Sequence, residues 1–389
     1  MPRLLFVLVA AHLALAPAPA FAADVAWDHW KTIAGIFDID GPRTDGSIIV
    51  AGSAALYLVD PAGTVTPFAR GPGGYHEDAG AEAYLAMSHG ENVSAAGCSF
   101  TPDDTFLLRL HVPIGVNRVN AAGDESGSFA NLTAGTVLNG IAIDITGDFD
   151  HRLLVTGLAG GKATVFAIDC NGAVQVITRS APRVEGGLAV APSSFGSFGG
   201  ALIAPDEVSG TIYAITKTGA VKTVAKPSLP IGGDIGVESV GFVPPGFFGR
   251  GGEVYYADRL TRGNRHPGAN GLLRLSSDQL ATAGVQDGDL LAVTEGGATM
   301  VAVRCESSCM VIPVVTKATK AHGEGHLTFV LNPPPPPSPS PSTPSAAPLS
   351  VPPGTVQLIG DWGIPAAAVL VFLALFAGLG VRALRRRGR

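Results

Sequence analysis

The stretch VFAIDCNG, residues 165–172, decides the fold because three further stretches of eight residues align with it without a gap. In each copy the first and fourth residues are apolar, a polar residue follows, and a glycine closes a turn before another short strand. The other copies are LYLVDPAG (56–63), VNRVNAAG (116–123) and IYAITKTG (212–219), and LLRLSSDQ (272–279) is a degenerate fifth. They read as β-hairpins that recur every 47 to 60 residues, which indicates radially repeated sheets.

The residues upstream of each hairpin supply two more strands, so each repeat is a four-stranded unit. The expected units begin at residues 35, 82, 139, 185, 238 and about 295. The unit from 238 should contain ESVGFVPP, EVYYADR, GLLRLS and DLLAVTE, which leaves only GATMVAV, MVIPVVT and HLTFVLN for the last. Because a propeller closes its ring by lending a strand from the other terminus, the unused segment 25–33 should complete that last sheet.

The sequence therefore predicts an all-β fold, a six-bladed β-propeller over residues 23–332 that is closed by an N-terminal strand. A sandwich of two sheets with about 24 strands is the less favoured alternative, because sandwiches are usually far smaller.

Both ends of the chain carry segments outside this fold. Residues 1–22 have the pattern of a secretory signal peptide, with Arg3 before an apolar run and Ala-Phe-Ala at the cleavage site. Residues 333–361 are a Pro-rich stalk, and 362–381 are expected to form one C-terminal transmembrane helix rather than a buried core helix. The basic tail 382–389 then stays in the cytoplasm, so the prediction is a single-pass type I membrane protein with an extracellular or periplasmic ectodomain. High Ala and Gly with little Lys suggest a bacterial source.

The net charge limits the classes of partner that the protein can bind, and the cysteine content limits the possible disulfides. The net charge of −6 predicts no basic face and therefore no nucleic-acid partner. Four cysteines in a secreted chain allow three disulfide pairings, of which Cys305 with Cys309, across a three-residue loop, is favoured. Cys98 and Cys170 would pair only by elimination.

Oxygen-bearing side chains stand at the start of five expected inner strands, where equivalent positions converge at one mouth of the central channel. They are Glu82, Asn139, Glu185, Glu238 and Glu295. Clustered carboxylates repel one another unless they are protonated or bridged by a cation, so an oxygen-seeking ion such as Ca²⁺ is the candidate cofactor. The alternative is that these side chains line a wet channel or cap neighbouring N–H groups without a metal.

The histidines offer a second set of candidates. His322 and His326 in HGEGH could act as a metal pair or a general base, and His76 stands beside Glu77 and Asp78. The alternative is that each is a solvated loop residue.

The phrases NGIAIDITGD and EGGLAVAP, with the hairpin VFAIDCNGAVQVI, resemble six-bladed propellers of the NHL and gluconolactonase/regucalcin type, to which streptogramin lyases are also similar. The resemblance covers about residues 25–332. For members that are lactonases it implies a divalent cation at the axis, held here by Glu82, Asn139, Glu185 and Glu238, although this ring is richer in Glu than the family pattern. The C-terminal segment, with Asp361-Trp362-Gly363, an apolar span and an arginine cluster, resembles PEP-CTERM or IPTL-CTERM sorting tails. That resemblance implies cleavage by a sorting transpeptidase as an alternative to permanent anchoring.

Two functional classes remain open at this point, because propellers host both. The favoured one is a membrane-anchored binding or scaffold module that presents its loop face to a protein or glycan. The other is a Ca²⁺-dependent hydrolase or lyase, lactonase-like, with its site at the channel mouth. Binding is favoured because no acid–base pair stands out in the sequence.

Overall fold

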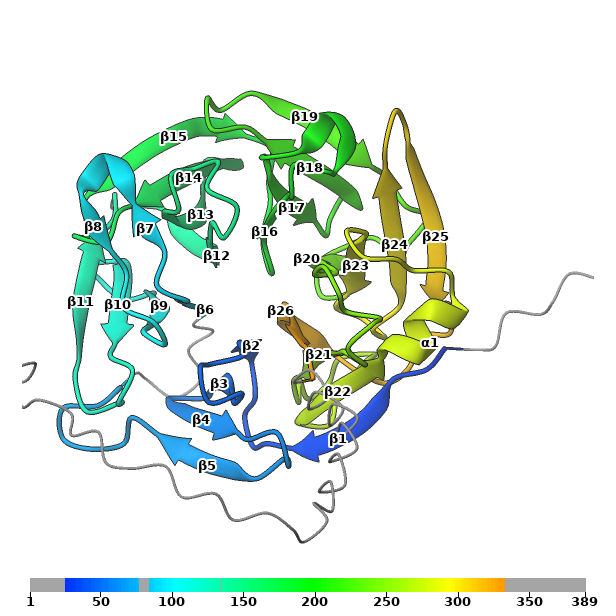
Figure 1. The fold of residues 1–389 in the computed structure, drawn as a ribbon, viewed down its shortest axis with the longest axis horizontal. Coiled ribbons are helices and arrows are strands. Elements are labelled where there is room, and N and C mark those ends of the chain that lie inside the picture. The colour runs from blue at the N-terminus through cyan, green and yellow to red at the C-terminus, as the bar shows by residue number, and fades with distance from the viewer. Residues whose placement is uncertain (1–24, 77–83, 134, 333–389) are drawn as a thin grey trace, which may run out of the picture. The chain divides into compact units, whose positions relative to one another are not determined.

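The computed structural model describes residues 25–76, 84–133 and 135–332, and within them six four-stranded antiparallel sheets form a ring (Figure 1). The prediction of an all-β, six-bladed propeller is therefore confirmed. Glu82 and residues 1–22 and 333–389, for which the sequence makes predictions, lie outside the described residues. In the described part of the chain no helix is both long and apolar enough to cross a membrane.

The first four blades follow the chain in order, from the inner strand outward, as the repeat predicts. Blade 1 is β2 (Asp38–Asp40), β3 (Ile48–Gly52), β4 (Ala55–Val59) and β5 (Val65–Phe68); blade 2 is β6 (Leu85–Met87), β9 (Thr105–Arg109), β10 (Gly115–Val119) and β11 (Ser126–Asn131). Blade 3 is β12 (Val137–Ile143), β13 (Leu153–Ala159), β14 (Lys162–Ile168) and β15 (Val174–Ala181); blade 4 is β16 (Ala189–Val190), β17 (Leu202–Asp206), β18 (Thr211–Ile215) and β19 (Val221–Ala225). In blade 2, a small ribbon of β7 (Asn92–Val93) and β8 (Cys98–Ser99) flanks the 3₁₀ turn Ser94–Ala96.

Blades 5 and 6 exchange strands, and here the predicted assignment is wrong. Blade 5 is β20 (Val237–Phe242), β23 (Leu290–Thr294), β24 (Met300–Cys305) and β25 (Cys309–Val315). Blade 6 is β26 (Gly323–Val330), β21 (Glu253–Asp258), β22 (Gly271–Ser276) and β1 (Asp28–Thr32). The chain thus leaves blade 5 after its inner strand, builds the middle of blade 6, and returns. The predicted closure by the N-terminal segment is confirmed, because β1 lies in the same sheet as the C-terminal strand β26.

The exchange explains why the fifth hairpin copy is degenerate. In blade 6 the strand after β22 is replaced by β1 from the N-terminus, so the chain after β22 forms the helix α1 (Ser277–Thr282) instead of a turn. The residues Ser276 and Gln279 form a capping box in which each side chain accepts from the other's backbone N–H. The Gln279 amide also donates to the carbonyl of Ala26 at 3.0 Å, which ties the helix to the N-terminal segment.

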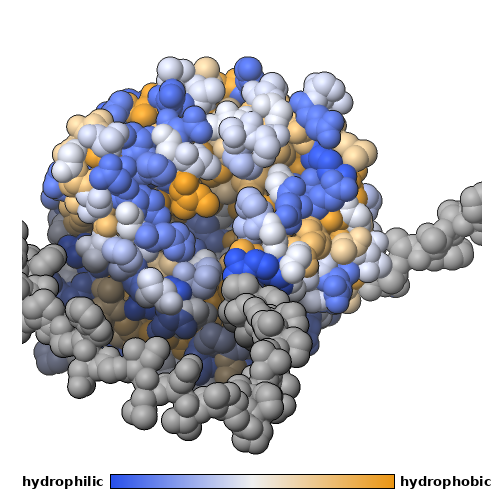
Figure 2. All heavy atoms as spheres, viewed as in Figure 1, coloured by the Kyte–Doolittle hydropathy of each residue, from blue (hydrophilic) through white to orange (hydrophobic). Residues whose placement is uncertain are grey.

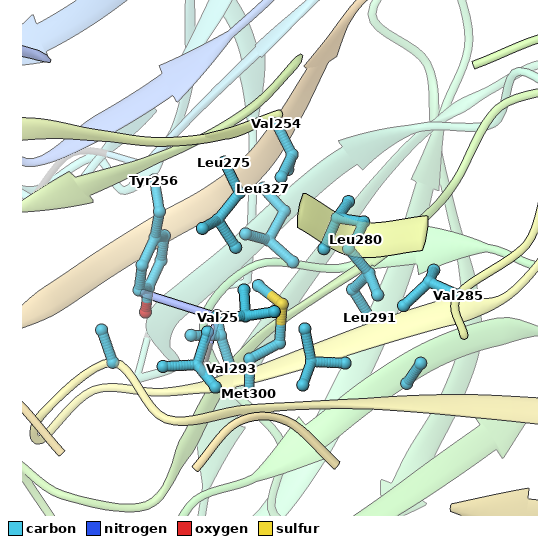
Figure 3. Close-up of a cluster of buried hydrophobic side chains, with 14 of the residues drawn as sticks. Val25, Val254, Tyr256, Leu275, Leu280, Val285, Leu291, Val293, Met300 and Leu327 are labelled. Atoms are coloured by element: carbon cyan, nitrogen blue, oxygen red, sulfur yellow. The ribbon is translucent and has the colours of Figure 1, made fainter. Parts of the chain in front are cut away.

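The core consists of six apolar clusters, each between two neighbouring blades. Successive side chains of a strand point to opposite faces of its sheet, so Leu153 and Val155 of β13 pack toward blade 2 and Leu154 packs toward blade 4. Figure 3 shows the largest cluster, between blades 5 and 6, where Val254, Tyr256 and Leu275 face Leu291, Val293 and Met300. Because both faces of every blade are buried, each blade depends on both of its neighbours.

Two disulfides join the cysteines in pairs. Cys305 is bonded to Cys309 across the β24–β25 turn, and Cys98 in blade 2 is bonded to Cys170 at the end of β14 in blade 3. The second bond therefore links adjacent blades at their outer parts.

A buried ion pair joins four blades at the axis. Asp38 of β2 accepts from the backbone N–H groups of Leu85 in blade 2, at 2.7 Å, and of His326 in blade 6, at 2.6 Å. The His326 ring places Nδ1 3.0 Å from both oxygens of Asp38 and Nε2 2.6 Å from the carbonyl oxygen of Ile141 in blade 3. Because both ring nitrogens face acceptors, the ring is an imidazolium that donates twice.

Candidate functional site

Acidic side chains gather at the channel mouth where the inner strands begin. Glu238 and Glu324 are the second residues of the inner strands β20 and β26, and Glu185 precedes β16. Glu207 and Glu295 come from the loops that directly follow the second strands β17 and β23. We call these five residues together with His322 the channel-mouth cluster; it belongs to blades 4, 5 and 6.

Glycines allow the blades to approach closely enough for this gathering. Gly186 has φ +77°, and a Cβ there would collide with the backbone carbonyl of Glu238. Its N–H donates to the carbonyl of Asn139 at 2.8 Å, and the N–H of Gly187 donates to that of Glu238 at 3.0 Å. The segment Glu185-Gly186-Gly187 thus bridges blades 3 and 5 through backbone hydrogen bonds.

Glu185, Glu207 and Glu238 form the first of two groups within the cluster. One oxygen from each lies within 4.8 Å of the others. The Arg183 guanidinium donates to Glu185 Oε2 and to Glu207 Oε1, both at 2.8 Å. Burial raises the pKa of Glu207 to about 9, and a hydrogen bond with Glu185 together with its charge acts in the same direction. At neutral pH and without a cation, Glu207 therefore holds a proton.

Glu238 is the most enclosed carboxyl of that group, with 2% of its surface exposed. Burial raises its pKa well above the usual range, and the charges of Glu324 and Glu295 add to this effect. The Tyr84 hydroxyl from blade 2 donates to Glu238 Oε1 at 2.7 Å. That phenol stays protonated, because burial and the neighbouring carboxylates raise its pKa as well.

Glu295, His322 and Glu324 form the second group. His322 Nε2 lies 3.0 Å from Glu295 Oε1 and 3.6 Å from Glu324 Oε1, and Arg259 Nη1 lies 3.2 Å from Glu324 Oε1. Burial disfavours the charged imidazole, but the hydrogen bonds and charges of the two glutamates outweigh it and raise the pKa of His322 to about 9. Without a cation, the ring is therefore protonated at neutral pH and donates Nε2–H to Glu295.

Among the described residues, the groups of the cluster sum to an excess of two negative charges when all five carboxyl groups are ionised. Five carboxylates face the guanidinium groups of Arg183 and Arg259 and the His322 imidazolium. In a buried site, two protons or one divalent cation can neutralise that excess of negative charge. The first group fits a hard cation, since its donors are all carboxylate oxygens and oxygens bound to one Ca²⁺ at about 2.4 Å are at most about 4.8 Å apart.

Four of the five residues predicted for the channel mouth lie in the described part of the chain, and the structure places them differently relative to the cluster. Glu185 and Glu238 meet in the first group. Glu295 reaches the second group from another position than predicted, because it follows β23, the second strand of blade 5, and does not begin an inner strand. Asn139 stands beside the cluster: its amide donates to the carbonyl of Val184 at 2.8 Å and lies 3.5 Å from Glu185 Oε2.

Sequence reasoning missed Glu207, Glu324, Arg183, Arg259 and Tyr84. A shared signal was present for two of them, since a charged residue directly follows the second strand in blades 4, 5 and 6, at Glu207, Glu295 and Arg259. The HGEGH motif does not act as a pair either, because His322 joins the cluster whereas His326 binds Asp38. His76 is exposed.

No protein-family model and no curated protein matches the sequence. Among solved structures, a virginiamycin B lyase from Staphylococcus aureus is 11% identical over 77% of this chain and 92% of its own, with a TM-score of 0.42. A putative gluconolactonase is 13% identical over 78% of this chain and 88% of its own, with a TM-score of 0.42. A putative TolB from Agrobacterium tumefaciens is 11% identical over 78% of this chain and 92% of its own, with a TM-score of 0.39. Likeness at this level carries no argument about function, and the six-bladed fold rests on the sheet topology.

Proposed function

We propose that the protein is an extracytoplasmic binding or scaffold propeller, held at a membrane by residues 362–381, whose channel-mouth cluster binds one divalent cation. Ca²⁺ is the proposed ion, with Glu185, Glu207 and Glu238 as its carboxylate ligands. The observation that carries the proposal is the excess of two negative charges in a buried, oxygen-rich group. A cation there would supply the opposite charge that two protons supply without it.

Burial favours binding over hydrolysis as the role of this ion. Glu207, Glu238, Glu295, Glu324 and His322 are each at most 5% exposed, so a substrate would have little access to them. A hydrolase or lyase needs an acid or base within hydrogen-bond reach of its substrate. We therefore propose that the ion braces blades 4 and 5 and that the surrounding loop face carries the binding function.

Calcium titration of the purified protein, followed by its melting temperature, tests this proposal. A ligand that binds only the folded state stabilises it by about 2.7 kcal/mol at a hundred times its Kd. We expect the melting temperature to rise with Ca²⁺ at pH 7 and the rise to disappear in Glu207→Gln and Glu238→Gln variants. Glu125→Gln, which changes an exposed carboxylate in blade 2, is the matched control and should respond as the unaltered protein does. No shift at millimolar Ca²⁺ would overturn the cation site.

Cell fractionation tests the membrane tether separately. The full chain should sediment with membranes, and a Leu373→Arg/Phe376→Arg variant should shift to the soluble fraction because two charges oppose insertion of the apolar span. A full chain that is soluble from the start would refute the tether and leave the cation proposal standing.

A further inference from the structure

A cavity of about 450 Å³ lies at the opposite end of the axis from the channel-mouth cluster. The inner strands show the separation directly. β20 begins beside Glu238 of the cluster and ends at Phe242 of the cavity, and β12 likewise passes from Asn139, beside the cluster, to Ile143 of the cavity. His326, which is paired with Asp38, also lines the cavity, whereas none of the residues of the channel-mouth cluster does.

The walls of this cavity are apolar and belong to the ends of the inner strands. They include Ile143, Leu188, Val190, Phe242 and Phe329, and Ile145 at the entrance is 65% exposed. Figure 2 shows the face that Figure 1 shows, with apolar side chains among hydrophilic ones near its centre. Concave sites of about 300–1,000 Å³ with apolar walls and a few converging polar groups are typical of small-molecule sites.

The polar group at the floor of the cavity is Asp40, at the end of β2. Its two oxygens accept from the backbone N–H groups of Gly41 and Met87, each at 2.7 Å, which fixes the carboxyl group in place. The side chain lies deep among its neighbours yet is only half-buried, because it faces the cavity. Burial raises its pKa, which the charges of His326 and His89 only partly offset.

Among the residues that the structure describes, Asp40 has no ion-pair partner within 4.0 Å. The nearby imidazolium of His326 is bound to Asp38, and these two charges cancel. His89 is exposed at the edge of the cavity, and Arg250 at the rim donates through Nε to the carbonyl of Asn332 at 2.9 Å. Asp38, Asp40 and His326 therefore sum to one negative charge when Asp40 is ionised, and Asp40 faces the cavity between apolar walls.

From this juxtaposition we propose that the cavity binds a small amphiphile that has an apolar body and one protonated amine. The amine pairs with the Asp40 carboxylate, and the apolar body lies against Ile143, Leu188 and Phe242. A hydrogen bond between charged groups in a water-poor site is stronger than one between neutral groups, so the ammonium group determines which ligand is preferred.

The chain's own stalk does not offer this chemistry. Residues 333–353, which follow the end of β26 near the cavity rim, contain no Lys, Arg or His. Because it has no basic side chain, that segment cannot form an ion pair with the Asp40 carboxylate. A ligand from outside the chain, with a positive head, is the occupant that fits both the walls and the floor.

Three probes of equal chain length test the proposal on the full-length protein: n-octylammonium, n-octanol and n-octanoate, below their aggregation limits and measured by titration calorimetry. We expect n-octylammonium to bind about tenfold or more tightly than n-octanol, and n-octanoate to bind weakest. Similar affinity for n-octanoate and n-octylammonium, or no binding of n-octylammonium, would overturn the proposal.

Two variants separate the roles of charge and shape. Asp40→Asn should reduce the preference for n-octylammonium over n-octanol to about twofold or less while n-octanol still binds, which also shows that the cavity has folded. Ala189→Trp, at a half-buried wall position, should abolish binding of both probes. Glu125→Gln is again the exposed control and should change neither. A preference that survives in Asp40→Asn would assign the selectivity to another group and refute the role of Asp40.

Discussion

Replacing Asp38 with asparagine would remove the carboxylate that holds four blades together at the axis. Asp38 is 0% exposed and accepts from the N–H groups of Ile39, Leu85 and His326 as well as from the His326 ring. An asparagine has one carbonyl oxygen in place of two carboxylate oxygens, so at least one buried donor would face an amide NH₂ group. The His326 imidazolium would lose its counter-charge at the same time.

The pKa of His326 sets the size of the expected loss. Burial opposes the charged ring, but the charge and hydrogen bond of Asp38 outweigh it and, with smaller contributions from Asp40 and the Ile141 carbonyl, raise the pKa from 6.5 to about 9. A pKa raised from 6.5 to about 9 corresponds to about 3 kcal/mol of folding free energy. Removal of one partner from a buried ion pair typically costs about 3–5 kcal/mol, which agrees with that value.

The same pKa predicts a pH dependence with a definite sign. Because the folded pKa lies above the unfolded one, the contribution is complete below about pH 6.5 and is lost as the pH rises through 9. Urea unfolding of the unaltered and Asp38→Asn proteins from pH 6 to 10 should therefore show a difference of about 3 kcal/mol that shrinks toward high pH. The contributions of His322 and Glu207 to the folding free energy also fall as the pH rises over this range. They are present in both proteins, so they cancel in the difference between the two unfolding free energies.

A surface pair provides the control for this experiment. Asp28 Oδ2 lies 2.7 Å from Arg274 Nη2, and the Asp28 side chain is 55% exposed. Asp28→Asn should cost less than about 1 kcal/mol, because solvent screens such a pair. An Asp38→Asn loss as small as that of Asp28→Asn, or one that does not change between pH 6 and 10, would refute the reasoning about the axial pair.

Three further predictions concern the cluster and the disulfides. In EDTA at pH 8, Glu238→Gln should melt at the same or a higher temperature than the unaltered protein, because burial and the charges of Glu324 and Glu295 disfavour the ionised carboxylate and a glutamine is neutral. A clear drop in a thermal melt would contradict this. Cys98→Ser/Cys170→Ser should lower the free energy of unfolding more than Cys305→Ser/Cys309→Ser. The first bond spans 72 residues and the second spans 4, for which loop-closure entropy gives about 4 kcal/mol and about 2 kcal/mol respectively. Equal losses in urea unfolding would count against the entropic account. Gly186→Ala should lower the free energy of unfolding by several kcal/mol, because the added Cβ collides with the carbonyl of Glu238. It should also abolish the Ca²⁺ response of the melting temperature. A variant that responds fully would be inconsistent with the close approach of blades 4 and 5.

The hairpin repeat predicts the blades wherever strand pairing is local. In blades 1 to 4 every strand pairs with its neighbour in sequence, apart from the β7–β8 ribbon inserted in blade 2, so the pattern of apolar residues and closing glycines was sufficient. It failed for DLLAVTE, now β23, which pairs with β20 and not with β22. Nothing in the alternating pattern of these strands says which blade they enter, because both faces of every blade are buried. The signal that was available lay in SSDQ at residues 276–279, a helix-capping sequence where the other copies have a turn.

The site was predicted in part for a related reason. Glu185 and Glu238 were found because they stand at the start of inner strands, a position that the local repeat defines. Glu207 was missed because it comes from the loop after the second strand, and Glu324 because the inner strand of blade 6 was mistaken for its third. Residues that meet through the order of the blades in space cannot be aligned before that order is known.

The strand exchange also gives the position of the cluster a physical meaning. The ring closes in blade 6, where β26 from the C-terminal side and β1 from the N-terminal side flank the hairpin of β21 and β22. Beside this closure the N–H of Gly323 at the start of β26 donates to the carbonyl of Glu295 in blade 5 at 2.8 Å, and the His322 ring pairs with the Glu295 carboxylate. The second group of the cluster thus joins the closing strand to blade 5, whereas the first group joins blade 5 to blade 4. Protons or a cation in the cluster therefore act on the blades that hold the ring closed, and melting temperature is the sensitive measure of either.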